Sequence, residues 1–460
     1  MSGFAWLAVL EGTAKRPVTG TSHSSGAASR AGGKAWSGSE LAKEAEVHCS
    51  ADDWRPGPFD VDGSKGATVP TQRKVLAVAH HITAATRLAD IMPLLESDRR
   101  VVVAYTAAPA SNFTGGLEEF LRGLGGVVLP WGQAIRSRFD LAVAASHGML
   151  EKLNAPILTV PHGSGPGKLL HRAEGFGPPA SRPVTGLIRE RLVVAGRVVP
   201  SSVAIAHERH QALLERECPE ALPVAFVAGD PCLDRLVASL PRRDAYRRAL
   251  GVGEGQRLVF VSSTWDTDSL LGRHPDLLTR IAAELPPEEY RIVAALHPHV
   301  WAWYGRRQVT SWYADAMALG VRLLPPEEGW RAALVAADRV IGDHGSVTSY
   351  GAALGVPVLL GAFPEESVAP GTHTARLGAV APRVDWSRPL RPQLDEAVHA
   401  FSAARYAAFR ADLSSRPGEA ARLIRQEMYR LMRLPDREEP PTVAPVPPPR
   451  PIVRDGTEAA

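Results

Sequence analysis

The chain is poor in cysteine, in long apolar runs and in charge of one sign. Three cysteines occur among 460 residues, at Cys49, Cys218 and Cys232. This odd, widely spaced set excludes a disulfide scaffold and is typical of a reducing compartment. No stretch approaches the roughly 18 apolar residues of a transmembrane helix, and residues 4–10 lack the basic flank and length of a signal peptide. We expect a cytoplasmic protein, with peripheral contact to a membrane surface left open.

Several functional motifs are absent as well. The formal net charge is only +3, and Arg alternates with Glu and Asp along the expected helices, so no basic stripe predicts a nucleic-acid partner. No G-x-x-x-x-G-K-[ST] occurs, which excludes a P-loop NTPase. No G-x-G-x-x-G follows the first expected strand, where His80 and His81 stand instead. A nicotinamide dehydrogenase is therefore not expected, and we predict no cofactor.

The order of apolar and polar segments predicts four regions. Residues 1–72 are rich in Gly, Ser, Ala and Lys, and residues 435–460 are rich in Pro, so both are expected to be disordered. Between them, short buried strands alternate with helical patterns in two series, residues 73–238 and 239–434. This alternation predicts an α/β protein with two Rossmann-like, doubly wound parallel-sheet domains that face a cleft. The helices include 83–95, 311–319, 391–412 and 417–434; the last two would close the second domain and reach back to the first.

Residues 338–360 read as a strand, a glycine turn, a helix and a second strand. The turn and the helix start contain Asp343, His344, Gly345, Ser346, Val347 and Thr348. The first amide N–H groups of a helix have no partner within it and favour a bound phosphate. An ordinary βαβ unit with a capped helix is the alternative interpretation.

Other polar residues follow expected strands, at the sheet edge where α/β proteins bind ligands. His162 lies in a glycine-rich loop that ends at Lys168, and an imidazole there is a candidate general base. A histidine simply hydrogen-bonded in a turn remains the alternative. In the second series, the candidate donors of hydrogen bonds to a phosphate are Ser263, Thr264, His297 and His299. No thiolate or third ligand accompanies these histidines, so we predict no metal site.

These elements resemble the CDP-glycerol glycerophosphotransferase family of teichoic-acid polymerases, which has a GT-B type fold. The family's W-H-G-T-x-x-K, G-[YF]-P-R-x-D, P-T-[WF]-R, [RK]-x-H-P and T-D-Y-S-S are similar, in the same order, to Pro161-His162-Gly163 with Lys168 beyond, Gly229 to Asp234, Ser263 to Asp266, Ala295 to Pro298 and Gly342 to Ser346. The similarity covers about 156–360. Asp266 and Cys232 stand at family arginine positions, and Lys168 is one residue further from the histidine than in the family.

The resemblance implies a role for each matching residue. His162 would activate the acceptor, His297 would contact the diphosphate, and Ser346 with the neighbouring amides would hold a phosphate. The implied function is transfer of a glycerol-phosphate or related group from a nucleotide-activated donor to an acceptor hydroxyl, such as that of a cell-wall polymer or a lipid-linked glycan. A sugar-nucleotide glycosyltransferase or 2-epimerase and a catalytically inactive nucleotide-binding protein remain the alternatives.

Overall fold

The computed structural model describes residues 54–55, 57–59, 67–170 and 182–453. Most of the predicted disordered segment 1–72 and the last residues of the predicted tail therefore lie outside the described residues, as does Cys49. Two short pieces of the first segment do pack. The Arg55 backbone N–H donates to the Gln133 side chain at 2.9 Å, and Phe59, which is buried, lies with its ring centroid 6.0 Å from that of Phe139.

The first half of the chain forms a parallel sheet, as predicted. Its strand order is β3-β2-β1-β4-β5-β8-β9, and every pairing is parallel. The strands are β1 (Arg73–Ala79), β2 (Val101–Ala107), β3 (Val127–Leu129), β4 (Leu141–Ala144), β5 (Ile157–Thr159), β8 (Ser202–Ile205) and β9 (Ala225–Val227). A small antiparallel hairpin, β6 (Val193–Val194) and β7 (Arg197–Val198), lies between β5 and β8 in the sequence.

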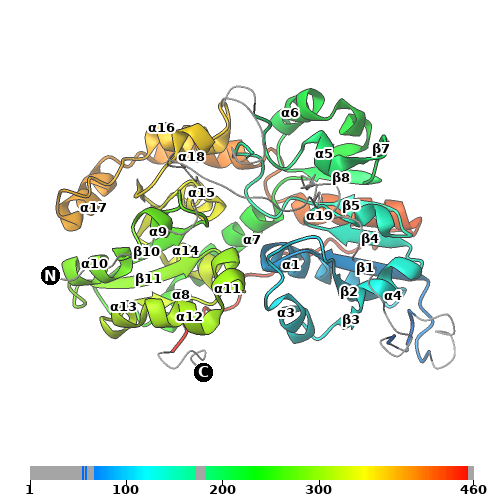
Figure 1. Cartoon of the computed structure of the whole chain (residues 1–460), viewed down its shortest axis with the longest axis horizontal. Helices are drawn as coiled ribbons and strands as arrows, with labels where there is room; N and C mark the ends of the chain where they lie inside the picture. Colours follow the sequence, from blue (N-terminus) through cyan, green and yellow to red (C-terminus); the bar gives the residue numbers. More distant parts are fainter. Residues whose placement is uncertain (1–53, 56, 60–66, 171–181, 454–460) are drawn as a thin grey trace, which may run out of the picture. The chain divides into compact units, whose positions relative to one another are not determined.

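The second half repeats the pattern in a smaller parallel sheet (Figure 1). Its order is β12-β11-β10-β13-β14, and its strands are β10 (Arg257–Ser263), β11 (Tyr290–Leu296), β12 (Arg322–Leu323), β13 (Arg339–Gly342) and β14 (Val358–Leu360). Each sheet has its first strand in the interior, flanked by the second and the fourth, which is the doubly wound Rossmann arrangement. The predicted fold class is confirmed.

Helices cover both faces of each sheet because the strands are apolar on both sides. Val75 and Ala77 of β1 point into one core cluster and Leu76 and Val78 into another. The helices of the first half are α1 (Ile82–Ile91), α2 (Pro93–Glu96), α3 (Leu117–Gly123), α4 (Trp131–Arg136), α5 (Arg189–Leu192), α6 (Arg209–Glu217) and α7 (Pro231–Ser239). Those of the second are α8 (Arg243–Ala249), α9 (Leu270–Arg273), α10 (Leu277–Glu284), α11 (Pro298–Tyr304), α12 (Arg306–Trp312), α13 (Ala314–Ala318), α14 (Trp330–Ala336), α15 (Ser346–Ala353), α16 (His373–Val380), α17 (Leu390–His399), α18 (Ala403–Leu413) and α19 (Ala420–Met432).

Three predicted helices are each two helices in the structure. The pattern at 83–95 is interrupted at Pro93, which starts α2, because proline has no N–H to continue α1. The pattern at 391–412 divides into α17 and α18, where Ser402 caps the second helix by accepting from the Arg405 N–H. The pattern at 311–319 is divided between α12 and α13. Apolar spacing alone does not locate such breaks.

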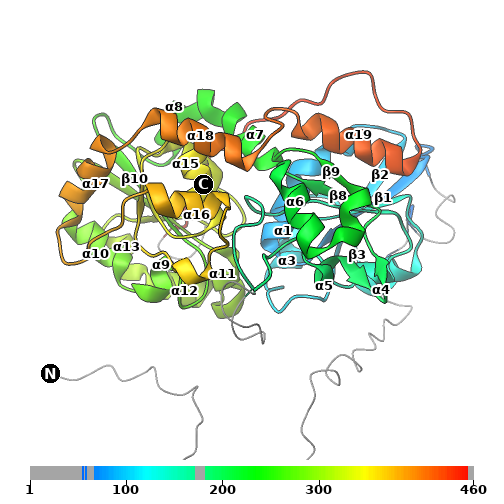
Figure 2. The same ribbon diagram turned by 90° about the horizontal axis from the view of Figure 1, so that it is seen from above.

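Helix α19 packs on the first sheet although it is the last helix in the chain (Figure 2). Its side chains Ile424, Met428 and Tyr429 are buried in the same cluster as Val75 and Leu88. The predicted reach of the final helix back to the first half is therefore seen directly.

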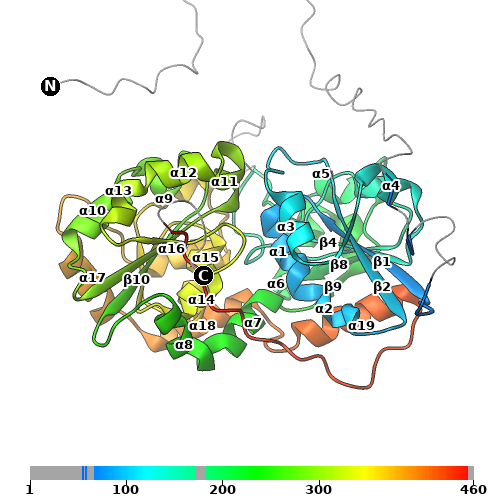
Figure 3. The same ribbon diagram turned by 90° about the horizontal axis from the view of Figure 1, so that it is seen from below.

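The segment that follows α19 corrects the prediction of a disordered tail for residues 435–453. It runs from α19 past α7 and α8 to the second sheet (Figure 3). Val446 is buried in the core of that sheet, and the Tyr246 hydroxyl donates to its carbonyl at 2.6 Å. The Ile452 N–H donates to the Leu323 carbonyl at 2.8 Å. Proline content led to the expectation of disorder, but apolar residues such as Val446 and Ile452 let this segment pack on the second half of the molecule.

Among the described residues, no helix is long and apolar enough to cross a membrane. Cys218 and Cys232 are both buried and carry free thiols.

Candidate functional site

The candidate site lies at the carboxyl ends of the central strands of each sheet. It is the point where later strands are added on the opposite side of the first strand, so that the strand order reverses. In the first sheet the reversal falls between β1 and β4, and in the second between β10 and β13. Open α/β sheets bind ligands at this position. His80 and His81 follow β1, and His147 follows β4; Thr264 follows β10, and Asp343 follows β13. All described residues fall in one structural unit, so contacts between the two sets of loops can be read directly.

Asp343 holds the turn before α15 in shape. Its carboxylate accepts the N–H groups of Thr264 at 2.7 Å, Leu270 at 3.0 Å and Gly345 at 2.9 Å. Burial raises the pKa of this carboxyl, while the three N–H groups and the Lys168 ammonium oppose the shift. Asp343 therefore ties the loop after β10 to the loop after β13.

The loop after β5 lies directly against this turn. The Ser164 N–H donates to the Ser346 hydroxyl at 3.2 Å, and the Lys168 ammonium donates to the Thr264 hydroxyl at 3.2 Å. A Cβ at Gly163 would lie 2.7 Å from the Ser346 hydroxyl oxygen, so a larger residue here would require the Ser346 side chain to move. The structure thus brings the loop that carries His162 to the predicted phosphate turn, although the two are far apart in the sequence.

Imidazole rings from both sheets meet beside this contact. The His81 ring centroid lies 4.9 Å from that of His162 and 5.5 Å from that of His299. His297 and His299 are 4.5 Å apart. Phe113, from the loop after β2, stacks on His299 at 3.8 Å and 8°. We call His81, His162, His297 and His299 the histidine cluster.

Backbone contacts fix the tautomers within the histidine cluster. His162 Nδ1 lies 2.6 Å from the Ala145 carbonyl oxygen, which can only accept, so Nδ1 carries the proton and Nε2 carries the lone pair. His81 Nδ1 accepts the Ala84 N–H at 3.2 Å, and His297 Nδ1 accepts the His299 N–H at 3.2 Å. In these two rings Nε2 is therefore the N–H donor. The cluster thus contains one ring with a basic Nε2 and two rings with Nε2–H donors.

Loss of contact with solvent keeps the histidine cluster neutral near pH 7, although by accessible surface only His81 is buried, His297 and His299 are half-buried and His162 is exposed. Burial, together with repulsion from neighbouring imidazoles, lowers the pKa of His81 to about 2 and that of His299 to about 4. Burial lowers the pKa of His297 well below its usual value. For His162 burial lowers the pKa most, the bond to Ala145 opposes this, and the nearby Arg87 guanidinium lowers it further. A neutral His162 is the form that can accept a proton.

Lys168 contributes a positive charge to the site. Burial lowers the pKa of its ammonium, while the carboxylates of Asp343 and Asp266 oppose the shift. His297, His299 and His344 all feel this charge, since each has its pKa lowered in part by Lys168. A half-buried ammonium next to neutral N–H donors and the first turn of α15 favours an anionic ligand.

Three of the predicted site residues make their contacts elsewhere and do not present a polar side-chain group to the anion site. The Ser263 hydroxyl donates to the Thr264 carbonyl and accepts the Leu271 N–H, so it supports the start of α9. The Thr348 hydroxyl lies under Gly342, where an added Cβ would be 2.3 Å from it. Val347 packs against the apolar core of the second sheet, which includes Phe260 and Val340. These residues support the loops around the turn and do not face the ligand position.

Sequence reasoning missed His81, Phe113 and a buried charge network. In the network, Asp230 caps α7, accepts the Tyr350 hydroxyl at 2.7 Å and lies 3.5 Å from Arg87. The signal for His81 was present, since it stands directly after the first strand at the position of the missing glycine motif. Nothing in the sequence pairs Arg87 with a residue of α15.

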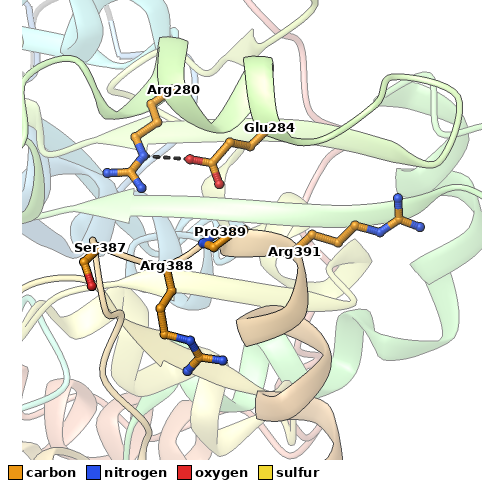
Figure 4. A pocket seen from close by; sticks show the side chains of 6 residues that line it. All are labelled: Arg280, Glu284, Ser387, Arg388, Pro389 and Arg391. Carbon is orange, nitrogen blue, oxygen red and sulfur yellow. Dashed lines mark hydrogen bonds and ion pairs between the residues drawn. The ribbon is translucent and has the colours of Figure 1, made fainter.

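Two cavities lie elsewhere. One of about 320 Å³ is lined by Arg280, Glu284, Ser387, Arg388, Pro389 and Arg391 (Figure 4). The other, of about 330 Å³, lies between α1, α7, α19 and residues 437–444. Neither is lined by a predicted site residue. Within the described ranges, no group of three or more His, Cys, Asp or Glu side chains is arranged to hold a metal ion.

No protein-family model matches the sequence, and no curated protein matches it. Solved structures do match. The wall teichoic acid polymerase TagF aligns over 81% of this chain and 92% of its own with 12% identity and a TM-score of 0.50. A variant of TagF soaked with CDPG covers 81% and 91% with 12% identity and a TM-score of 0.51. UDP-GlcNAc 2-epimerase from Neisseria meningitidis, bound to UDP-GlcNAc, covers 78% and 99% with 12% identity and a TM-score of 0.46. The chain therefore has the GT-B type fold that it shares with the teichoic acid polymerase TagF.

Proposed function

We propose that this protein is a transferase that moves a glycerol-phosphate or related group from a nucleotide-activated donor to an acceptor hydroxyl. The observation that carries the proposal is the juxtaposition of His162, with its lone pair on Nε2, and a half-buried anion site formed by Lys168 and the start of α15. A base and a phosphate site from opposite sheets are what transfer to a hydroxyl requires.

In this proposal each residue of the site has a role in one step of the reaction. With CDP-glycerol as donor, the acceptor O–H gives its proton to His162 Nε2, and its oxygen attacks the β-phosphorus. The bond from that phosphorus to the bridging oxygen breaks, and CMP leaves with the electron pair. Lys168, the Nε2–H of His297 and the first amides of α15 would stabilise the charge on the phosphoryl oxygens.

The variant His162→Asn tests the role of the base. Asparagine retains an N–H that can donate to the Ala145 carbonyl but has no basic nitrogen. Turnover with CDP-glycerol and a polyol-phosphate acceptor should fall by about 100- to 10,000-fold, while the dissociation constant for CDP, measured by calorimetry, changes little. Unchanged turnover in this variant would contradict the proposal.

Product analysis separates the alternatives. Release of CMP supports glycerol-phosphate transfer, release of a nucleoside diphosphate supports a glycosyltransferase, and reaction without an acceptor supports an epimerase. One feature favours a less charged donor than CDP-glycerol: Asp266, with a positive φ of 80°, lies near Lys168 and offsets part of its charge. Nucleotide binding without turnover across these donors would support an inactive binding protein.

A further inference from the structure

His81 makes two kinds of contact, one with the backbone of helix α1 and one with other histidine rings. It is the N-cap residue of α1, where its Nδ1 accepts the Ala84 N–H. Its ring also lies edge-on to His162 from its own sheet and to His299 from the other, with interplanar angles of 79° and 89°. The side chain is only 8% exposed. A residue needed only as a helix cap is usually Ser, Thr, Asp or Asn, which cap without such bulk.

The cap contact leaves one donor on the ring. Because Nδ1 accepts, the neutral ring carries its proton on Nε2. Within the described part of the chain, this Nε2–H forms no hydrogen bond. A donor held among His162, His299 and the other neutral rings is stabilised when an oxygen acceptor reaches it.

We infer that His81 donates an Nε2–H hydrogen bond to an oxygen of the phosphoryl group that is transferred, between the base His162 and the second-sheet residue His299. This inference rests on the proposed function, since it names a further residue that would touch the reacting group. Its ligand class is a phosphoryl oxygen of a nucleoside diphosphate.

The charges around the ring favour an anionic oxygen over other ligands. Lys168 and Arg87 both act on the histidine cluster, each lowering the pKa of at least one of its rings. A cationic group would be repelled here, and an apolar group would leave the Nε2–H without a partner. In contrast, an N–H donor aimed at a phosphoryl oxygen gains strength as charge develops in the transition state.

The variant His81→Asn separates the two roles of the residue, which are to cap α1 and to donate the Nε2–H hydrogen bond. Asparagine is among the best N-cap residues, so the cap on α1 and the melting temperature should be retained. Its shorter side chain, engaged at the cap, does not supply the Nε2–H. His81→Ala removes both functions and should also lower the melting temperature. The exposed His399, on α17, gives the matched control His399→Asn.

The measurements are calorimetric dissociation constants for a nucleoside diphosphate and for its monophosphate, which lacks the β-phosphate, together with turnover. The pair used is the one among CDP/CMP, UDP/UMP and GDP/GMP that the wild-type protein binds. His81→Asn should raise the dissociation constant of the diphosphate by about 5- to 10-fold and change that of the monophosphate by less than about 2-fold. It should lower turnover roughly 100-fold. His399→Asn should change none of these.

Each outcome decides. If the diphosphate and monophosphate weaken equally, or if neither binding nor turnover changes in His81→Asn while the wild type binds, the inference is wrong and the proposed function stands. If the wild type binds none of the three diphosphates, the proposed function fails and the inference fails with it.

Discussion

At the scale of single residues, this protein gathers several histidine rings that are buried or half-buried. Burial lowers the pKa of His80 to about 4, of His147 to about 3 and of His344 to about 2, besides its effects in the histidine cluster. A histidine residue can be read from a sequence, but its protonation state cannot. The state depends on which neighbours exclude solvent, and these come from distant segments.

This burial predicts loss of stability in acid. The ordinary pKa of 6.5 applies in the unfolded chain, so below pH 6.5 the unfolded state binds more protons than the folded state. The unfolding free energy should be unaffected by these rings above about pH 6.5. It should then fall as the pH drops toward 4, by about 1.4 kcal/mol per pH unit for each imidazole that differs in protonation.

Urea unfolding of the wild type and of His80→Asn between pH 8 and pH 5 checks this expectation. The variant should show a pH slope shallower by about one proton below pH 6.5. The two proteins should have parallel profiles above pH 7.5, which serves as the internal control. A stability that rises in acid would contradict the assigned neutral state.

At the scale of elements, the described segment after α19 behaves as part of the core. It has no helix and no long strand, yet Val446 and Ile452 are 3% and 2% exposed. Tyr246 of α8 and Ser239 at the end of α7 hold it by hydrogen bonds to the backbone of Val446. Proline-rich composition describes how such a segment is shaped. It does not tell whether the segment meets an apolar surface.

Val446→Asp should therefore destabilise the second sheet. An unpaired carboxylate in this core should lower the unfolding free energy by about 3 kcal/mol or more. Thr442→Asp, at an exposed position of the same segment, is the matched control and should change it by less than about 0.5 kcal/mol. Equal and small effects in chemical denaturation would show that the segment is not packed in solution.

At the scale of the whole described molecule, buried charges connect helices of the two halves. Arg331 of α14 donates to both carboxylate oxygens of Asp90 on α1, at 2.7 and 2.6 Å. Arg235 of α7 pairs with the same carboxylate. The side chains of Arg331 and Asp90 are each 4% exposed. This network and the Asp230–Tyr350 bond link helix α1, which begins beside His81, to helix α15, which begins at Ser346.

Arg331→Met should be far more damaging than loss of a surface ion pair. Removing one partner leaves the buried Asp90 with less compensation, and such changes cost about 3–5 kcal/mol. Arg391→Met removes a pair with Glu289 at 2.7 Å in which both side chains are exposed, and should cost about 0–1 kcal/mol. Calorimetric unfolding of both variants measures the difference; equal melting temperatures would contradict the role of the network.

The sequence by itself determined the fold class and the chemistry available. Uninterrupted apolar strands such as β1 and β10, separated by helical spacing, can only be satisfied by a parallel sheet covered on both faces. Because carboxyl ends of parallel strands share one edge, His162, Lys168, Thr264 and Asp343 could be expected to face ligands. Local spacing carries both conclusions.

Only the tertiary structure decided which of these residues meet and in what state. The contact of Ser164 with Ser346, the bond of His162 to the Ala145 carbonyl and the Asp230–Tyr350 bond join residues that are separated in the chain. Such contacts depend on how two separately wound sheets pack together, and burial then sets the charge of each group. A one-dimensional pattern records neither distance nor solvent exclusion, so the sequence could name the parts of the site but not assemble them.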